Sequence, residues 1–244
     1  MNRRTLLGVW AHPDDEAYTA GGLMAEFRRR GDRVVVVTAT LGEHGTDDPD
    51  AWPPLRMAER RQSELRASLA ALGVDELHVL GFEDGTCAQH DGAPLIAEYI
   101  TEVQPDLIVT MGPDGMTGHP DHRAVSKWAT DAWEATRPEA DLWYATLTPD
   151  FHRDWGDLND EMGIWADQPD PPCTEFGDLV YSASLLDDLL DAKMAALGAH
   201  ESQTKSLIDA AGPDVYRQWW RTESFRQVRA SPNPNTWRFA SSIQ

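Results

Sequence analysis

Two kinds of hydrophobic pattern alternate along the first 147 residues of the chain. Short, dense apolar runs predict β-strands, because β-branched residues fit strands that are covered on both faces. These runs lie at residues 6–11, 33–38, 77–80, 107–110 and 142–147. Between them, apolar residues recur at helical spacing, which predicts helices at residues 16–30, 54–72, 94–103 and 119–136.

Strand and helix follow each other with short connections, the pattern of βαβ units. We therefore expect an α/β fold that is Rossmann-like: a mostly parallel sheet with helices on both faces. Residues 1–147 are expected to form this core, and residues 148–244 a C-terminal elaboration over the site that belongs to the same domain. The elaboration is predicted to contain an extended run near Val180, two helices and, from Ala230, a surface tail. Those helices are expected at residues 185–200 and 213–220, whereas residues 149–172 fit no element.

Charge narrows the range of partners. The 244 residues include 41 acidic and 21 basic side chains, for a net charge of −20. This balance excludes a protein whose main task is to bind nucleic acid, and it disfavours anionic membranes, since both need clustered Lys and Arg. Residues 150–191 alone hold twelve acidic residues and one basic residue, Arg153. We expect this acidic segment to be a substrate-facing lid or an interface that disfavours anionic sugars, with a solvated surface as the alternative.

Cysteine content and hydropathy predict the compartment. The two cysteines, Cys87 and Cys173, are too few for a disulfide scaffold or a cysteine-based zinc finger. No apolar stretch approaches the length of a membrane span, and the apolar run near the N-terminus is too short for a signal peptide. The sequence therefore favours a cytoplasmic protein, and it is compatible with a homo-oligomer.

Candidate chemistry lies after the first and fourth predicted strands, at the sheet edge where ligands of α/β folds bind. The first strand is followed by His12-Pro13-Asp14-Asp15-Glu16 instead of the glycine-rich turn of a dinucleotide-binding protein. The fourth is followed, after a glycine-rich turn, by His119-Pro120-Asp121-His122. Imidazole and carboxylate are ligands of catalytic zinc, so His12, Asp15 and one histidine of the second motif predict a divalent metal site. The remaining Asp and His side chains are of the types that act as base and acid beside such a metal.

The two motifs together resemble those of the LmbE/PIG-L family of metal-dependent N-deacetylases. Weaker matches extend this resemblance over roughly residues 5–205: Thr38-x-x-Leu41-Gly42-Glu43, Arg61-x-x-Glu64, Gly81-Phe82-x-Asp84-Gly85 and Lys193-x-x-Ala196-Leu197-x-x-His200-x-Ser202-Gln203. The resemblance implies an enzyme that removes the acetyl group from an N-acetylated amino sugar or glycoconjugate through a zinc-bound water. It implies no organic cofactor and a small-molecule partner.

The resemblance also implies a role for each matching residue. The implied zinc ligands are His12, Asp15 and His122. Asp14 is the implied general base, His119 the residue that stabilises the tetrahedral intermediate or protonates the leaving amine, and Asp121 the residue that holds His119. The implied substrate-binding residues are Arg61, Asp84 and Glu43. His200 falls in a family motif to which we assign no role.

Three other functions share some of these residues. An amidase that cleaves a larger acyl group, such as a thiol-conjugate amidase, would use every catalytic residue named above. A non-haem Fe(II) oxygenase also uses two histidines and one carboxylate, and Fe²⁺ or another divalent metal is an alternative to zinc. The third is a metal-binding module without catalysis. Asp14 and His119 beside the metal triad favour hydrolysis over the last two.

Overall fold

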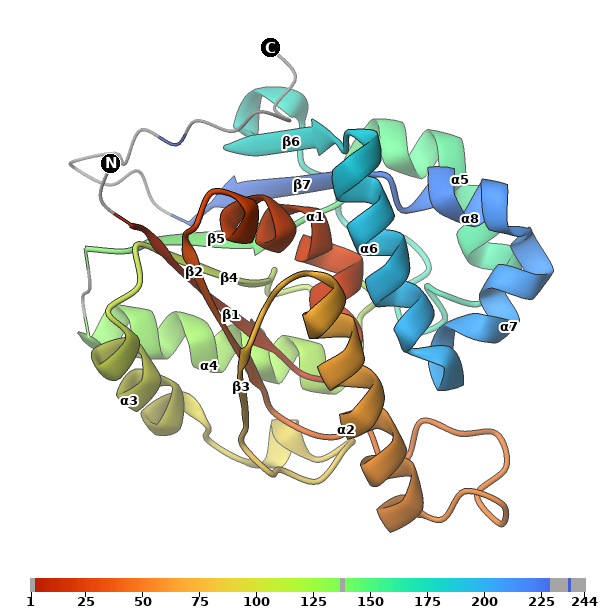
Figure 1. Ribbon diagram of the computed structural model, residues 1–244, viewed down its shortest axis with the longest axis horizontal. Coiled ribbons are helices and arrows are strands. Elements are labelled where there is room, and N and C mark those ends of the chain that lie inside the picture. The colour runs from red at the N-terminus through yellow and green to blue at the C-terminus, as the bar shows by residue number, and fades with distance from the viewer. Residues whose placement is uncertain (1–2, 137–138, 229–236, 238–244) are drawn as a thin grey trace.

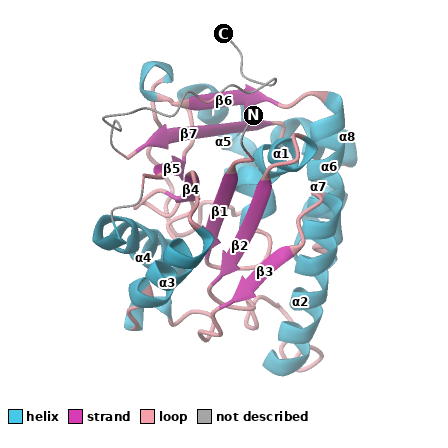
Figure 2. Cartoon of the chain, turned by 60° about the vertical axis from the view of Figure 1, so that its left-hand side comes forward, coloured by secondary structure: helices cyan, strands magenta, loops and turns pink. Residues whose placement is uncertain are grey.

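The computed structural model describes residues 3–136, 139–228 and 237, and a single seven-stranded sheet organises them (Figure 2). The strand order is β3-β2-β1-β4-β5-β7-β6. The first five strands are parallel, whereas β7 pairs antiparallel with both β5 and β6. The strands are β1 (Thr5–Trp10), β2 (Arg33–Thr38), β3 (Glu76–Val79), β4 (Leu107–Met111), β5 (Asp141–Ala145), β6 (Tyr181–Ser184) and β7 (Thr222–Gln227).

Helices cover both faces of this sheet, which confirms the predicted α/β class. The α-helices are α1 (Asp15–Arg29), α2 (Pro54–Ala71), α3 (Ala93–Val103), α4 (Pro120–Thr136), α5 (Pro149–Glu161), α6 (Asp187–Ala199), α7 (Glu201–Ala211) and α8 (Pro213–Trp219). Alternate residues of the central strands enter two separate cores: Leu6 and Val34 pack with α1, α2 and α6, whereas Leu7 and Val35 pack with α3 and α4. Burial on both faces explains why these strands read as continuous apolar runs.

The helices and strands predicted before residue 147 lie within two residues of their expected bounds, but the C-terminal part differs. Residues 149–172, which fit no element in the sequence, begin with α5. Its first turn is capped by the Thr148 hydroxyl, which accepts a hydrogen bond from Phe151 N at 3.1 Å. The motif around His200 divides at that residue between α6 and α7, and α7 is a helix that the sequence pattern did not predict. Strand β7 was not predicted, and the tail predicted from Ala230 lies outside the described residues.

The C-terminal elements lie beside the carboxyl ends of the parallel strands. Helices α5, α7 and α8 gather at this side of the molecule (Figure 1). Both sequence motifs also lie here, because each begins the connection that follows a central strand. Among the described residues, no helix combines the length and the apolar character that crossing a membrane requires.

Candidate metal centre and active site

The two motifs meet because β1 and β4 are neighbours in the sheet. His12 follows β1, and Asp15 begins α1. The Asp15 carboxylate accepts hydrogen bonds from Ala11 N at 3.1 Å and His12 N at 2.8 Å, and so fixes the turn between strand and helix. The second motif enters α4, whose first residue, Pro120, suits a helix start because its missing N–H costs no hydrogen bond there.

Three side chains converge with the spacing of metal ligands. His12 Nδ1 lies 3.1 Å from His122 Nε2, His122 Nε2 lies 3.3 Å from Asp15 Oδ1, and His12 Nδ1 lies 3.7 Å from Asp15 Oδ2. Tetrahedral zinc with ligands at about 2.1 Å separates them by about 3.4 Å. These distances are compatible with one metal ion, and His119 also places a ligand atom within 4.8 Å of those of His12 and His122.

Hydrogen bonds on the far side of each imidazole leave the converging nitrogens free to act as ligands. His12 Nε2 lies 3.1 Å from Asp84 Oδ1 and 3.4 Å from Asp121 Oδ2. His122 Nδ1 lies 3.0 Å from the Gly115 carbonyl oxygen. These acceptors orient the two rings so that His12 Nδ1 and His122 Nε2 face each other, the arrangement in which both can ligate one metal ion once His12 has lost its proton. Carboxylate and carbonyl partners of this kind orient metal-bound histidines.

The electrostatics of the cluster favour a cation. Burial alone lowers the pKa of His12, but hydrogen bonds with Asp121 and Asp84 outweigh it and raise the pKa to about 10. Burial alone raises the pKa of Asp15, but the facing His122 and His12 outweigh it and hold the pKa well below its usual range. A raised histidine pKa and a lowered carboxyl pKa both mean that the cluster stabilises positive charge among ionised carboxylates, as a candidate His/Asp metal site should.

Asp14 stands beside this cluster in a strained conformation. Its φ of 104° lies in the left-handed region, which costs a non-glycine residue of order 1–3 kcal/mol. Arg61 fixes the turn, because its Nη2 donates to the Pro13 carbonyl at 2.6 Å and lies 3.4 Å from Asp14 Oδ2. Burial raises the pKa of Asp14 and Arg61 lowers it, with a net value of about 6. The half-buried carboxylate is thus a suitable proton acceptor near neutral pH.

Glycine makes room for Arg61. The Arg61 Nη1 donates to the Gly42 carbonyl at 2.9 Å, and a Cβ at Gly42 or Gly45 would collide with the guanidinium. The loop after β2 therefore wraps the arginine closely. Arg61 is buried, and it lines the same cavity as Asp14.

Behind Asp14 lies a second buried ion pair, between Glu16 and His200. Glu16 Oε2 accepts the Asp14 N–H at 3.0 Å, and Glu16 Oε1 lies 3.1 Å from His200 Nε2. Burial alone lowers the pKa of His200, but Glu16 outweighs it and raises the pKa. The motif histidine thus supports the turn of Asp14 from behind.

His119 faces the cavity, but Asp121 does not hold it in the expected way. The Asp121 backbone N–H donates to His119 Nδ1 at 3.2 Å, which leaves the proton of the neutral ring on Nε2. Burial and the nearby His12 and His122 lower the pKa of His119, so the neutral form is favoured. The Asp121 carboxylate is fully buried and accepts instead from Gly85 N at 2.7 Å and Cys87 N at 3.0 Å, beneath His12.

Asp84 and Glu43, the remaining residues expected to bind substrate, differ in whether they line the cavity. Asp84 lines the cavity, and its Oδ2 accepts from His44 N at 3.0 Å. Glu43 is not among the described residues that line it. The Glu43 carboxylate accepts the Asp84 N–H at 3.1 Å and so holds the loop that carries Asp84.

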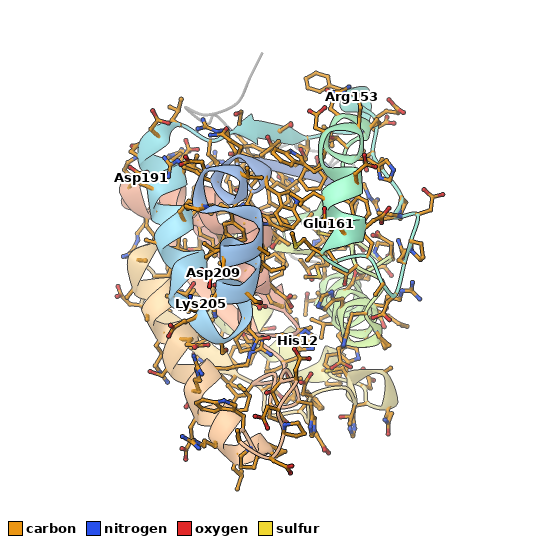
Figure 3. All side chains as sticks on the ribbon, turned by 90° about the vertical axis from the view of Figure 1, so that its right-hand side faces the viewer. His12, Arg153, Glu161, Asp191, Lys205 and Asp209 are labelled. Carbon is orange, nitrogen blue, oxygen red and sulfur yellow. The ribbon has the colours of Figure 1, made fainter. Side chains whose placement is uncertain are left out.

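A cavity of about 530 Å³ opens over the cluster. Its floor is polar and consists of the motif residues, whereas one wall is largely apolar and comes from α1, α5, α7 and the neighbouring loops. The residues of this aromatic wall are Tyr18, Met116, Leu147, Phe151, Ile164, Trp165, Leu207 and Trp220. Figure 3 looks onto α5 and α7 from this side, with His12 lower in the view.

The sequence profile of the PIG-L family, described as GlcNAc-PI de-N-acetylase, matches residues 7–133. The chain is also 34% identical over 236 residues to 1D-myo-inositol 2-acetamido-2-deoxy-alpha-D-glucopyranoside deacetylase of Mycolicibacterium gilvum (strain PYR-GCK), an alignment that covers 86% of this chain and 80% of the relative. The chain belongs to the PIG-L family. It is thus a deacetylase, as the paired motifs predict.

Solved structures support the fold of this PIG-L family member. The N,N'-diacetylchitobiose deacetylase of Pyrococcus horikoshii matches with a TM-score of 0.67 at 20% identity, over 93% of this chain and 84% of that chain. The 4-carboxy-2-hydroxymuconate hydratase of Pseudomonas putida KT2440 matches with a TM-score of 0.56 at 18% identity, over 96% of this chain and 100% of that chain. A hydratase with the same fold shows that architecture alone does not decide the reaction.

The acidic segment of this family member has two sides. Its twelve acidic residues are all exposed, and Asp167 is the one acidic residue of the segment among those described as lining the cavity. The same segment lines the cavity with Phe151, Ile164 and Trp165. Most of its charge therefore lies on a solvated surface, and its apolar side chains face the site. Thr148-Pro149, a helix-start signal, could have revealed α5 and with it this wall.

Proposed function

We propose that this chain is a zinc-dependent N-deacetylase that hydrolyses the acetamide of an N-acetylglucosamine-containing small molecule. The observation that carries the proposal is the convergence of His12, Asp15 and His122 at 3.1–3.7 Å, with Asp14 beside them in one cavity. The M. gilvum relative acts, by its name, on such a substrate. The two free cysteines fit the expected cytoplasmic setting.

Asp14 and His119 have separate roles in the reaction. Asp14 takes a proton from the attacking water and returns it to the amine nitrogen as the C–N bond breaks. His119, neutral and with its proton on Nε2, donates a hydrogen bond to the carbonyl oxygen as negative charge develops there. Arg61 and Asp84 line the cavity, which supports their assignment as residues that bind the sugar.

The metal would be held by His12, Asp15 and His122. When bound, it polarises the acyl carbonyl and lowers the pKa of a coordinated water. Two imidazoles and one carboxylate match catalytic zinc, and Fe²⁺ accepts the same set.

A second candidate is an amidase for a larger acyl group or a thiol conjugate. The aromatic wall favours it, since apolar side chains of this kind bind an extended apolar group. Both candidates use the same catalytic residues, so the cavity decides between them.

A panel of acyl groups on one amine separates the two candidates. Zinc-loaded enzyme is incubated with N-acetyl, N-butyryl and N-octanoyl glucosamine, and with 1D-myo-inositol 2-acetamido-2-deoxy-α-D-glucopyranoside, and the released amine is measured. The deacetylase proposal predicts the highest kcat/KM for acetyl substrates. A higher kcat/KM for octanoyl than for acetyl would favour the amidase. No amine release from any of them would refute the deacetylase and an amidase for larger simple acyl groups.

A further inference from the structure

Tyr18 places a phenol in the cavity one helical turn beyond Asp14. The Tyr18 N–H donates to the Asp14 carbonyl at 3.0 Å, and both side chains line the cavity. The phenol oxygen lies 2.8 Å from the phenol oxygen of Tyr216. Tyr216 is 2% exposed, whereas Tyr18 is only half-buried. The two hydroxyls thus form a pair in which Tyr18 belongs to the cavity lining and Tyr216 is buried outside it.

The Tyr18–Tyr216 pair can donate one further hydrogen bond. Two hydroxyls carry two protons, and their mutual bond uses one. If Tyr18 were the donor, the Tyr216 proton would be left in buried surroundings, where an unsatisfied polar group costs about 1–3 kcal/mol. The opposite direction, with Tyr216 donating, leaves the proton of Tyr18 free to point into the cavity. Among the described residues, neither phenol oxygen has a second hydrogen-bond partner.

The position of Tyr18 is fixed from two sides. Its ring meets that of Trp220 edge-on, with centroids 4.5 Å apart. Its carbonyl accepts a hydrogen bond from the buried Lys193 ammonium at 2.7 Å. Tyr18 stands where the polar floor of the cavity gives way to the aromatic wall, so a substrate with its amide near Asp14 passes this phenol on the way to the wall.

We propose that Tyr18, oriented by Tyr216, is a substrate-binding hydrogen-bond donor that recognises a hydroxyl or ether oxygen of the group attached to the acetylated amine. This inference rests on the proposed function, because it assigns Tyr18 to the substrate of that reaction. It makes Tyr18 a determinant of specificity for oxygen-rich amines such as sugars.

Two substitutions separate contact with substrate from support of the fold. Tyr18→Phe and Tyr216→Phe delete the same hydrogen bond, but only the first removes the donor from the cavity. Tyr144→Phe is a control, because it deletes a hydroxyl pair with Thr130, at 2.5 Å, that lies outside the cavity lining. For each variant we would measure kcat and KM with 1D-myo-inositol 2-acetamido-2-deoxy-α-D-glucopyranoside, the thermal midpoint and the zinc content.

The expected result is a KM that rises about tenfold in Tyr18→Phe, from the loss of one buried hydrogen bond, with kcat within about twofold. Tyr216→Phe is expected to raise KM less than about threefold, and Tyr144→Phe to leave it unchanged. A KM of Tyr18→Phe within twofold of wild type, or a rise matched by Tyr216→Phe, would overturn the inference alone. Absence of turnover by the wild-type enzyme would overturn the proposed function instead, and the inference with it.

Discussion

Only three lysines occur in the chain, and one of them is fully buried. Lys193 Nζ lies 2.8 Å from Glu223 Oε1, and the Glu223 carboxylate also accepts the backbone N–H groups of Gly22 at 2.8 Å and Leu23 at 2.9 Å. This pair joins α6 and β7 to the helix that carries Asp15. Replacing Lys193 by Met keeps an unbranched side chain that is one atom shorter, but it leaves a buried carboxylate without its counter-charge.

The expected loss of stability follows from the burial of the Lys193–Glu223 ion pair. Removing one partner of a buried ion pair costs about 3–5 kcal/mol. For a domain of this size each kcal/mol lowers the thermal midpoint by about 2–4 °C, so Lys193→Met should lower it by about 6–20 °C. The control is Lys205→Met, because Lys205 is exposed and pairs with Asp209 at i+4. Such exposed pairs contribute about 0.3–0.5 kcal/mol, which is under about 2 °C.

Thermal and urea unfolding measure both variants, with chelator present so that metal binding does not add to stability. The double variant Lys193→Met/Glu223→Gln should recover more than half of the loss, since it removes the uncompensated charge. A Lys193→Met midpoint no lower than that of Lys205→Met would refute the reasoning. So would a double variant whose loss equals the sum of the two single losses.

Two further predictions concern the supports of Asp14. Arg61→Lys should lower the thermal midpoint by about 4–8 °C and should lower kcat/KM at least tenfold. The reason is that one ammonium group cannot replace the guanidinium, which donates to both the Pro13 and the Gly42 carbonyl. An unchanged midpoint would contradict this prediction. The raised pKa of His200 means that its pairing with Glu16 contributes fully below about pH 6.5 and is lost as pH rises through the folded-state pKa. The stability difference between wild type and His200→Asn should therefore shrink between pH 6 and 9, and a difference independent of pH would count against the ion pair.

The core of the fold could be predicted because its strands are buried on both faces and leave a clear pattern. The C-terminal part was predicted less well. In α5, Phe151, Trp155 and Leu158 recur at helical spacing between exposed acids and Thr148-Pro149 marks the start, so the sequence did carry a signal for this helix. At His200 the chain breaks between α6 and α7 with ψ of 50°, where the imidazole contacts Glu16 of a distant helix. A tertiary contact of this kind has no local signal.

The candidate site, like the fold, could be predicted only in part. Ligand types and their position after β1 and β4 follow from sequence, and the three predicted metal ligands converge in one place. The position of the Asp121 carboxylate does not follow, because its partners are backbone N–H groups of Gly85 and Cys87. Any residue type supplies a backbone donor, so no motif encodes that contact. The expected homo-oligomer stays a prediction.

Zinc binding and turnover measured together on Asp14→Asn test the central claim most directly. Enzyme stripped of metal is titrated with zinc, and amine release from 1D-myo-inositol 2-acetamido-2-deoxy-α-D-glucopyranoside is followed at each step. Asp32→Asn serves as the control, since Asp32 is also buried but contacts Arg4 N at the other end of the strands. The account predicts one zinc per chain in all three proteins, with turnover in wild type and Asp32→Asn and a loss of at least a thousandfold in Asp14→Asn. Full turnover by Asp14→Asn, or turnover by wild type that does not depend on metal, would contradict it.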